Sequence, residues 1–167
     1  MSVPFRVGMG YDSHRFEAGR PLVLGGVTIP YPLGLKGHSD GDALIHAVCD
    51  ALLGAVADGD IGAHFPDSDP QWKNADSARF LVAVAGRLRG KGWDVVNVDV
   101  TVIAQEPKLR PHVDAIRVRL ADLLGISRDA VSVKGKTNEG MDATGRKEGI
   151  AVHAVALVAR RDGEEVG

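Results

Sequence analysis

Hydrophobic and polar positions along the chain form segments that predict strands and helices. Runs that are apolar or alternate in polarity predict five strands, over residues 3–12, 22–30, 93–105, 130–136 and 149–159. Three longer segments are expected to form helices, over residues 42–56, 75–88 and 113–124. The order β-β-α-α-β-α-β-β favours a single α+β domain over residues 1–167, with a mixed or antiparallel β-sheet and helices on one face.

The other face of this predicted sheet is also rather apolar. Exposing a large apolar surface to water is unfavourable, so we expect this face to be buried against another surface. An interface with further copies of the chain is the expected cover.

The predicted helix over residues 42–56 has a recognisable start. Ser39-Asp40-Gly41-Asp42 precedes it and resembles a capping box, so Ser39 is expected to be the N-cap. The loop that follows the helix, residues 58–72, is long for a passive connection and is therefore a candidate for function.

Composition and charge narrow the class of protein. The 167 residues are 44% hydrophobic and 25% charged, as in a soluble globular protein, and the net charge is -2. This balance gives no electrostatic case for binding nucleic acid or an anionic membrane. The single cysteine, Cys49, excludes an internal disulfide and suits a reducing compartment. No signal peptide or membrane-length apolar run is recognisable, so we expect a cytoplasmic protein.

Three side chains are candidates for a metal site. Asp12 and His14 lie two residues apart on a strand segment and therefore point to the same side. His46 lies on the predicted helix, at the border between its apolar and polar sides. Together they offer three nitrogen or oxygen ligands and leave a fourth position open, which is typical of catalytic zinc, although manganese and iron accept such ligands too.

The neighbours of His46 suggest how its ring is held. Asp42 and Asp50 lie four residues before and after it, so either carboxylate is expected to accept a hydrogen bond from the second ring nitrogen. Cys49 falls within the apolar stripe, and we interpret it as a buried small hydrophobic residue rather than a fourth ligand.

Other motifs are open to two interpretations each. His38 and Ser39 precede a helix, where an anion can bind, but Ser39 can equally be a simple cap. The loop over residues 58–72 is either a turn-rich surface segment or a lid over a substrate. Residues 134–146, KGKTNEGMDATGR, can bind phosphate and magnesium or only form a turn. Residues 107–110, PKLR, contain two basic side chains that can hold phosphate or simply be solvated.

Taken in order, these motifs resemble those of the 2-C-methyl-D-erythritol 2,4-cyclodiphosphate synthase family. The matching strings, which span nearly the whole chain, are Asp12-Ser13-His14, His38-Ser39-Asp40-Gly41-Asp42 with His46, Gly59-Asp60-Ile61-Gly62, Phe65-Pro66-Asp67, Ala104-Gln105 with Pro107-Lys108, and Thr144-Gly145-Arg146 with Glu148-Gly149. The length matches the single-function form of this family, without a cytidylyltransferase domain.

The resemblance implies a phosphorus–oxygen lyase of non-mevalonate isoprenoid biosynthesis. Its substrate would be 4-diphosphocytidyl-2-C-methyl-D-erythritol 2-phosphate, and its products 2-C-methyl-D-erythritol 2,4-cyclodiphosphate and CMP. It also implies a homotrimer with active sites between adjacent subunits, Zn²⁺ on Asp12, His14 and His46, and a second ion, Mg²⁺ or Mn²⁺, on Glu139.

The resemblance also assigns roles to further residues. His38 and Thr137 would position and polarise phosphates as catalytic residues. Residues 60–62 and 65–69 would hold the methylerythritol part, and residues 104–110 and 136–139 would face the cytidine diphosphate. The implied substrate-binding residues are Ser39, Asp60, Ile61, Gly62, Phe65, Asp67, Asp69, Ala104, Pro107, Lys108, Leu109, Arg110, Lys136, Asn138, Ala143 and Arg146.

The sequence departs from the family pattern in two places. Ala143 stands where the family usually has phenylalanine, and Gly135-Lys136-Thr137-Asn138-Glu139 replaces a common Ala-Thr-Thr-Thr-Glu run. Lys136 therefore adds positive charge near the expected nucleotide phosphates. Both departures concern cytidine contacts and the region near Arg146, and they leave the three expected zinc ligands unchanged.

Two other functions are compatible with a metal site. A zinc-dependent phosphoester hydrolase would need a metal-activated water and a nearby base, for which Asp60 is the only obvious candidate, and no HExxH motif is present. A non-catalytic oligomer with a structural metal would need a closed set of four ligands, for which only Cys49 is an extra soft ligand. The cyclisation needs no general base, because the attacking phosphate is already an anion.

Overall fold

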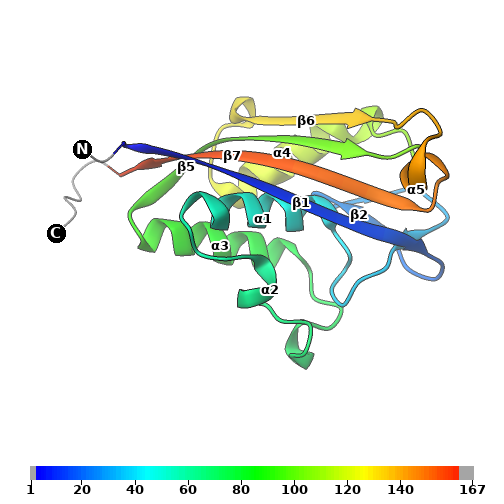
Figure 1. Cartoon of the computed structure of the whole chain (residues 1–167), viewed down its shortest axis with the longest axis horizontal. Coiled ribbons are helices and arrows are strands. Elements are labelled where there is room, and N and C mark those ends of the chain that lie inside the picture. The colour runs from blue at the N-terminus through cyan, green and yellow to red at the C-terminus, as the bar shows by residue number, and fades with distance from the viewer. Residues whose placement is uncertain (1–2, 162–167) are drawn as a thin grey trace.

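A five-stranded β-sheet forms the frame of the molecule, in the computed structural model that describes residues 3–161 (Figure 1). The strand order is β4-β1-β7-β5-β6, and all neighbours are antiparallel except β5 and β6. A hairpin of β2 and β3 forms a separate small sheet. The bounds are β1 (Phe5–Glu17), β2 (Leu22–Leu24), β3 (Val27–Ile29), β4 (Gly34–Leu35), β5 (Trp93–Ile103), β6 (Val131–Lys136) and β7 (Gly149–Arg160).

Three helices of 12 or 13 residues pack on this sheet and confirm the predicted α+β class. α1 (Ala43–Ala55) packs on β1 and β7, α3 (Ala78–Gly90) on β5, and α4 (Val113–Leu124) on β6. Short turns of helix complete the order: α2 (Ile61–His64), η1 (Pro70–Trp72), η2 (Arg110–His112), η3 (Arg128–Ala130) and α5 (Asp142–Gly145). Across residues 3–161, none of the helices is both long and apolar enough to cross a membrane.

Two glycines allow α1 to lie directly against β1. A Cβ atom on Gly8 would lie 1.9 Å from the Ala51 carbonyl oxygen, and one on Gly10 would lie 1.9 Å from that of Ala47. Because side chains alternate along a strand, Asp12 and His14 point to the same side as these glycines, toward α1. The close approach therefore brings the N-terminal half of α1 to Asp12 and His14.

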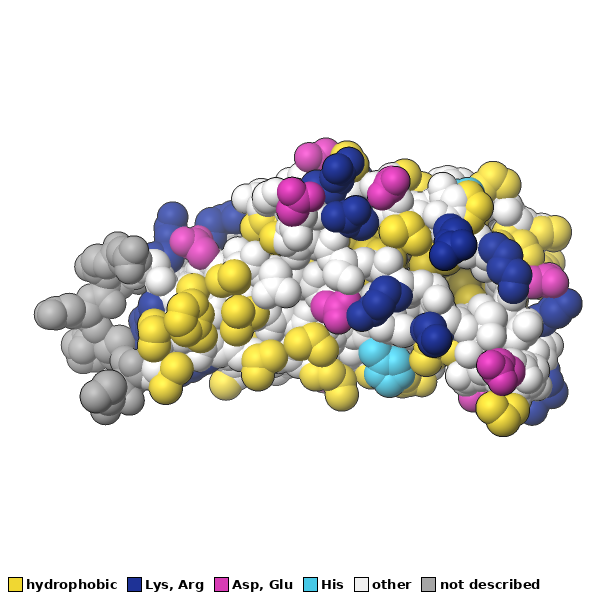
Figure 2. Space-filling model, turned by 90° about the horizontal axis from the view of Figure 1, so that it is seen from above, with side chains coloured by type: hydrophobic (Ala, Val, Ile, Leu, Met, Phe, Trp, Pro, Cys, Tyr) yellow, Lys and Arg dark blue, Asp and Glu magenta, His cyan; other side chains and the backbone are white. Residues whose placement is uncertain are grey.

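The other face of β1 carries large hydrophobic side chains, as the sequence predicts. Val7, Met9 and Tyr11 are 67%, 65% and 51% exposed, and Met9 pairs with Val155, which is 42% exposed. Figure 2 shows a face of the molecule on which hydrophobic side chains gather toward the left end, while many of the Lys and Arg side chains lie in the middle and toward the right. In one chain the apolar face of β1 has no cover within the described residues.

The structure corrects several predicted boundaries. β1 continues to Glu17, so Asp12 and His14 lie inside a strand rather than at its end. The segment over residues 22–30 is a hairpin, because Gly25 and Gly26 adopt positive φ angles of 61° and 72° and turn the chain. The predicted loops contain the short elements β4, α2, η1, η2 and α5.

The predicted N-cap of α1 is wrong. Gly41 has a positive φ of 75°, so the helix cannot begin before it, and α1 starts at Ala43. Asp42 is the N-cap, and its Oδ1 accepts a hydrogen bond of 3.0 Å from the Ile45 N–H. The Ser39 hydroxyl therefore does not cap the helix, and it contacts the side chains of His46 and Ser77.

Candidate active site

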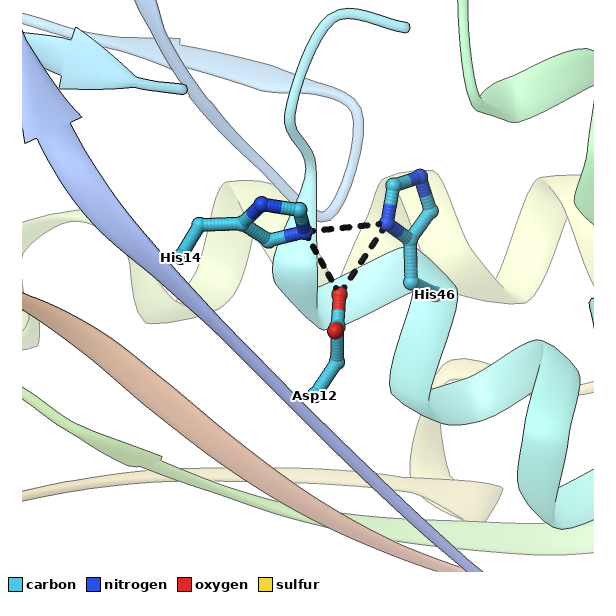
Figure 3. A group of neighbouring side chains, drawn as sticks. All are labelled: Asp12, His14 and His46. Atoms are coloured by element: carbon cyan, nitrogen blue, oxygen red, sulfur yellow. Dashed lines mark hydrogen bonds and ion pairs between the residues drawn. The ribbon is translucent and has the colours of Figure 1, made fainter. Parts of the chain in front are cut away.

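Asp12, His14 and His46 converge on one point, as the sequence predicts (Figure 3). Asp12 Oδ2 lies 2.8 Å from His14 Nε2 and 3.0 Å from His46 Nδ1, and the two nitrogens are 3.4 Å apart. β1 supplies the first two side chains and α1 supplies the third. These three side chains, called the metal cluster below, are the group that could hold a metal ion among the described residues.

The arrangement fits a tetrahedral cation. Ligand atoms about 2.0–2.1 Å from tetrahedral zinc lie about 3.3 Å from one another, close to the separations seen here. Each ring also has a polar partner for its other nitrogen, because His14 Nδ1 is 2.6 Å from the Lys36 carbonyl oxygen and His46 Nε2 is 2.9 Å from Ser77 Oγ. With those nitrogens protonated, the nitrogens that face Asp12 keep their lone pairs free for a metal.

The electrostatics of the cluster favour an anionic Asp12. Burial acts to raise the pKa of Asp12, but hydrogen bonds with His14 and His46 outweigh it and lower the pKa to about 2. Burial acts to lower the pKa of His14, and the hydrogen bond with Asp12 outweighs it, so that this pKa is raised. The carboxylate thus stays charged at neutral pH, and a proton on His14 is the competitor of a bound cation.

Cys49 is not part of this cluster. It is fully buried in the hydrophobic core, and burial raises the pKa of its thiol well above the ordinary value. The prediction that it acts as a small hydrophobic residue is therefore confirmed, and a closed four-ligand shell that includes it is not supported.

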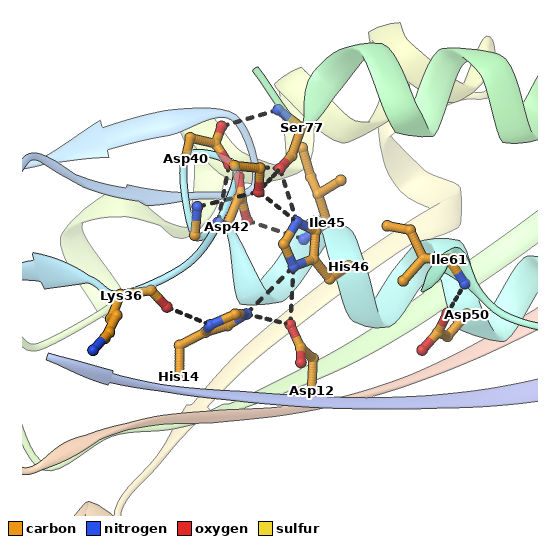
Figure 4. Close-up of polar contacts among 12 residues, drawn as sticks. Asp12, His14, Lys36, Asp40, Asp42, Ile45, His46, Asp50, Ile61 and Ser77 are labelled. Atoms are coloured by element: carbon orange, nitrogen blue, oxygen red, sulfur yellow. Dashed lines mark hydrogen bonds and ion pairs between the residues drawn. The ribbon is translucent and has the colours of Figure 1, made fainter. Parts of the chain in front are cut away.

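The predicted partners of the His46 ring are wrong (Figure 4). Asp42 accepts hydrogen bonds from the backbone N–H groups of Gly25, Gly26 and Ile45, and Asp50 accepts one of 2.7 Å from Ile61 N. Both carboxylates therefore position backbone segments, and Ser77 takes the place beside the ring. Sequence spacing cannot identify Ser77, because it lies 31 residues from His46 and at the start of another helix.

A cavity of about 350 Å³ opens beside the three side chains. Its lining contains six further residues that the sequence predicts, namely His38, Ser39, Ile61, Gly62, Phe65 and Asp67. It also contains Trp72 and Phe80, which sequence reasoning missed. Phe65 stacks on Phe80 with ring centroids 4.5 Å apart and meets Trp72 edge-on at 5.2 Å, so these rings form an aromatic wall.

Two predicted substrate ligands have local structural tasks. Asp60 is the N-cap of α2, where its Oδ1 accepts a hydrogen bond of 2.9 Å from Ala63 N. Asp69 caps η1, and its carbonyl oxygen lies 3.3 Å from His38 Nε2. Neither lines the cavity beside the metal cluster, although both shape the loop that does.

The predicted nucleotide-facing residues surround a second cavity, of about 580 Å³. It lies between the ends of β5 and β6 and the start of α4. Lys108, Arg110, Lys134 and Lys136 contribute cationic side chains to this cavity, which we call the basic pocket. Seven of the predicted residues line it, namely Ala104, Pro107, Lys108, Leu109, Arg110, Lys136 and Thr137.

The remaining predicted residues lie on the loop after β6. Glu139 has a positive φ of 52°, and its N–H donates to Thr137 Oγ1 at 3.2 Å. The Asn138 amide donates to Asp142 Oδ2 at 2.6 Å, which braces the loop internally. Ala143 lines a third cavity beside Ser13 and Arg15, and Arg146 pairs with Glu148 at 2.8 Å.

One chain does not bring the metal cluster and the basic pocket together. The two cavities share no lining residue. In the sheet, β7 and β5 separate β1, which carries Asp12, from β6, which carries Lys136. Three strand spacings of about 4.8 Å place β1 and β6 roughly 14 Å apart. The predicted residues thus form two half-sites within a chain.

Comparison with known proteins gives a consistent result. The YgbB family matches residues 5–159. The chain is 56% identical to a 2-C-methyl-D-erythritol 2,4-cyclodiphosphate synthase of Bordetella petrii, an alignment that covers 96% of this chain and 99% of the relative.

Two solved structures are similar to this chain over more than nine tenths of its length. A 2C-methyl-D-erythritol-2,4-cyclodiphosphate synthase in a form with bound CDP superposes with a TM-score of 0.84 at 40% identity, over 92% of this chain and 99% of that chain. The bifunctional IspDF from Campylobacter jejuni superposes with a TM-score of 0.93 at 40% identity, over 96% of this chain. The match spans 44% of the length of that bifunctional chain.

Proposed function

This chain belongs to the YgbB family of 2-C-methyl-D-erythritol 2,4-cyclodiphosphate synthases, and we propose that it converts 4-diphosphocytidyl-2-C-methyl-D-erythritol 2-phosphate to the 2,4-cyclodiphosphate with release of CMP. It is then a lyase of isoprenoid precursor biosynthesis. The observation that carries this proposal is the convergence of Asp12, His14 and His46 in a chain so similar to the named synthases.

The reaction joins two phosphates of one substrate. An oxygen of the 2-phosphate attacks the β-phosphorus, and the bond from that phosphorus to the oxygen bridging it to the α-phosphate breaks. CMP leaves with the electron pair of that bond. No base is required, because the attacking oxygen is already anionic, so the task of the protein is to align the phosphates and offset their mutual repulsion.

We assign Zn²⁺ to Asp12, His14 and His46. When bound, the ion supplies positive charge beside the reacting phosphates. His38 lies in the lining of the same cavity and is placed to contact a phosphate oxygen. The second ion, Mg²⁺ or Mn²⁺, is assigned to Glu139, whose exposed carboxylate is a suitable oxygen ligand.

The basic pocket is assigned to the cytidine diphosphate. Lys108, Arg110 and Lys136 give it positive charge, and the Thr137 hydroxyl in its lining offers a hydrogen bond to a phosphate oxygen. The bound CDP of the related synthase supports a cytidine nucleotide as ligand. The cavity that contains Phe65 and Asp67 is left for the methylerythritol part.

We propose a homotrimer in which adjacent subunits complete each active site. The separation of the two half-sites supports this, since a substrate that spans both must find the second half elsewhere. The exposed Val7, Met9 and Tyr11 supply apolar surface that an interface would bury. A single functional domain over residues 1–167 and a cytoplasmic location complete the proposal, the latter in keeping with the one buried cysteine.

A zinc-dependent phosphoester hydrolase is the less favoured function. That reaction needs a base beside a metal-bound water, and Asp60 is the candidate that the sequence offers. The Asp60 carboxylate instead caps α2, and Asp60 does not line the cavity beside the metal cluster.

Product analysis by phosphorus NMR tests the proposed reaction. We expect purified protein with zinc, magnesium and the cytidyl substrate to release CMP and a cyclic diphosphate. Release of CMP with a linear diphosphate would show hydrolysis instead. Absence of turnover in protein that holds its metal would support the non-catalytic alternative.

Mixing two inactive variants tests the shared site. His46→Ala removes a metal ligand from one half, and Glu139→Gln removes the proposed carboxylate ligand from the other. If the halves come from adjacent subunits, co-refolded equal mixtures form hybrid trimers with one intact site each, and about one quarter of wild-type activity should return. No recovery in trimers shown by mass spectrometry to be mixed would mean that each chain builds its own site.

A further inference from the structure

The Ser77 hydroxyl lies between the His46 ring and a carboxylate (Figure 4). Ser77 Oγ is 2.9 Å from His46 Nε2 and donates to Asp40 Oδ1 at 2.5 Å. Since His46 Nδ1 faces Asp12 and His14, Nε2 is the nitrogen that carries the proton when Nδ1 binds a cation. The ring N–H then donates to Ser77, the nearer of two hydroxyls, since Ser39 Oγ lies 3.2 Å from Nε2, and Ser77 donates to Asp40.

The Ser77 side chain does not cap α3, although its position at the start of that helix suggests that it would. It is the N-cap residue of α3, where serine side chains usually accept a backbone hydrogen bond, yet it makes no such cap. The Asp76 carboxylate accepts from Ala78 N at 2.9 Å in its place. The helix start is therefore satisfied without the Ser77 hydroxyl, which is free to serve His46.

Asp40 is itself held by the backbone. Its Oδ1 accepts from Asp42 N and its Oδ2 from Ser77 N, each at 3.0 Å. Three hydrogen bonds thus fix the Asp40 carboxylate, which is the last acceptor in the series His46–Ser77–Asp40. A negative charge on this acceptor strengthens the two hydrogen bonds of the series. Ser77 is fully buried, so it cannot touch substrate in the cavity.

We propose that Ser77 and Asp40 are positioning residues for the metal centre, which act by fixing the tautomer and orientation of His46. The inference rests on the proposed metal assignment. It gives the two histidines different supports: a backbone carbonyl, Lys36 O, for His14 and a hydroxyl–carboxylate pair for His46. Only the second support is removable by a side-chain substitution.

Zinc affinity measured by competition with a chromophoric chelator tests this role. We expect Ser77→Ala to weaken zinc binding about 10–100-fold, the range for partners that orient a metal-bound histidine. Asp40→Asn should weaken it in the same direction, and Ser77→Thr, which keeps the hydroxyl, should bind within a few-fold of wild type. The visible spectrum of the Co²⁺-loaded protein should shift in Ser77→Ala, because the angle of the His46 ring changes.

Controls separate positioning from folding. Ser127→Ala removes an exposed hydroxyl that caps η3, far along the chain from the metal cluster, and should leave zinc affinity unchanged. Thermal melting of each metal-free variant, compared with metal-free wild type, reports any loss of fold. Wild-type affinity and spectrum in folded Ser77→Ala would overturn the proposal, as would Ser77→Thr as weak as Ser77→Ala with both folded.

Two further outcomes are decisive. If Ser77→Ala does not fold, Asp40→Asn decides, and wild-type zinc affinity in that variant would overturn the proposal. If the wild-type protein binds no zinc or cobalt, the metal assignment fails and this inference fails with it. The other case is different. If the wild-type protein binds zinc and Ser77→Ala binds it equally well, the metal assignment stands and only the positioning role of Ser77 is refuted.

Discussion

The metal cluster and the basic pocket are built in different ways. At the metal cluster each polar group has a partner within the chain: Asp12 between two rings, His14 on a backbone carbonyl, and His46 on Ser77. At the basic pocket Lys134 pairs with Asp99, but the cationic groups of Lys108, Arg110 and Lys136 form no ion pair with any side chain in residues 3–161.

This difference matches the ligands assigned to the two places. A small cation requires its ligands at fixed short distances, so the protein must hold them rigidly before binding. A diphosphate is larger and solvated, and flexible cationic side chains can close on it when it arrives. Substitutions at the metal cluster should therefore abolish function, whereas those at the basic pocket should weaken binding by degrees.

The largest effect is expected for Asp12→Ala. Loss of the anionic ligand should remove bound zinc and lower turnover about 10³-fold or more, since metal charge stabilisation contributes several kcal/mol. Metal analysis of the purified variant and a CMP-release assay measure both. Asp122→Ala removes an exposed carboxylate from α4 as a control, and an active, metal-loaded Asp12→Ala would refute the assigned site.

The pH dependence of zinc affinity should be the next largest effect. The pKa of His14 is raised above its ordinary value of 6.5, so the proton competes with zinc on the acid side. Because the proton must leave first, apparent affinity should rise with pH and fall about tenfold for each unit below that raised pKa. Asp12, with a pKa of about 2, stays ionised throughout this window. Chelator competition from pH 5.5 to 8 measures the slope, and a flat profile would contradict it.

A smaller effect is expected for Lys136→Ala at the basic pocket. Loss of one exposed cation should lower kcat/KM about tenfold, mainly through KM, and should reduce the sensitivity of KM to salt. Zinc affinity should not change. Arg128→Ala, which removes a cation before the opposite end of β6, is the matched control, and equal losses in both variants would argue against a specific phosphate contact.

The smallest effect is expected for Asp58→Asn. Asp58 forms ion pairs with Arg87 of α3 and with Lys91 at the C-cap of that helix, which anchor the segment leading to α2. These hydrogen bonds hold the pKa of Asp58 well below its ordinary value, so its contribution to stability is present above about pH 4 and is lost as pH falls further.

Exposed ion pairs of this kind contribute little, and a decrease in Tm of about 2 °C at pH 7 is expected. Thermal unfolding followed by circular dichroism measures it. The difference between Asp58→Asn and wild type should shrink steadily at low pH, as the wild-type carboxylate becomes protonated. A constant difference from pH 7 to pH 2 would mean that the ion pairs are not its cause.

The fold class could be predicted from the sequence, because it depends on local periodicity. The grouping of Asp12, His14 and His46 could be predicted from their spacing together with the family resemblance. The i, i+2 spacing of Asp12 and His14 places them on one side of a strand, and helical spacing places His46 at a core border. Motif order likewise identified the loops that line the cavities. Prediction failed at the N-cap of α1 because two local patterns, at Ser39 and Asp42, competed there. It failed at the partner of His46 because Ser77 lies 31 residues away in the sequence.

The partner of the His46 ring and the close approach of α1 to β1, in contrast, became apparent only in the tertiary structure. Ser77 reaches His46 because α3 packs on α1, and α1 reaches Asp12 because Gly8 and Gly10 permit contact with β1. The division of the predicted site residues into two half-sites also arises at this level, since strand order places β7 and β5 between them. Such contacts join residues remote in sequence through packing, and packing is a property of the whole chain that no local pattern encodes.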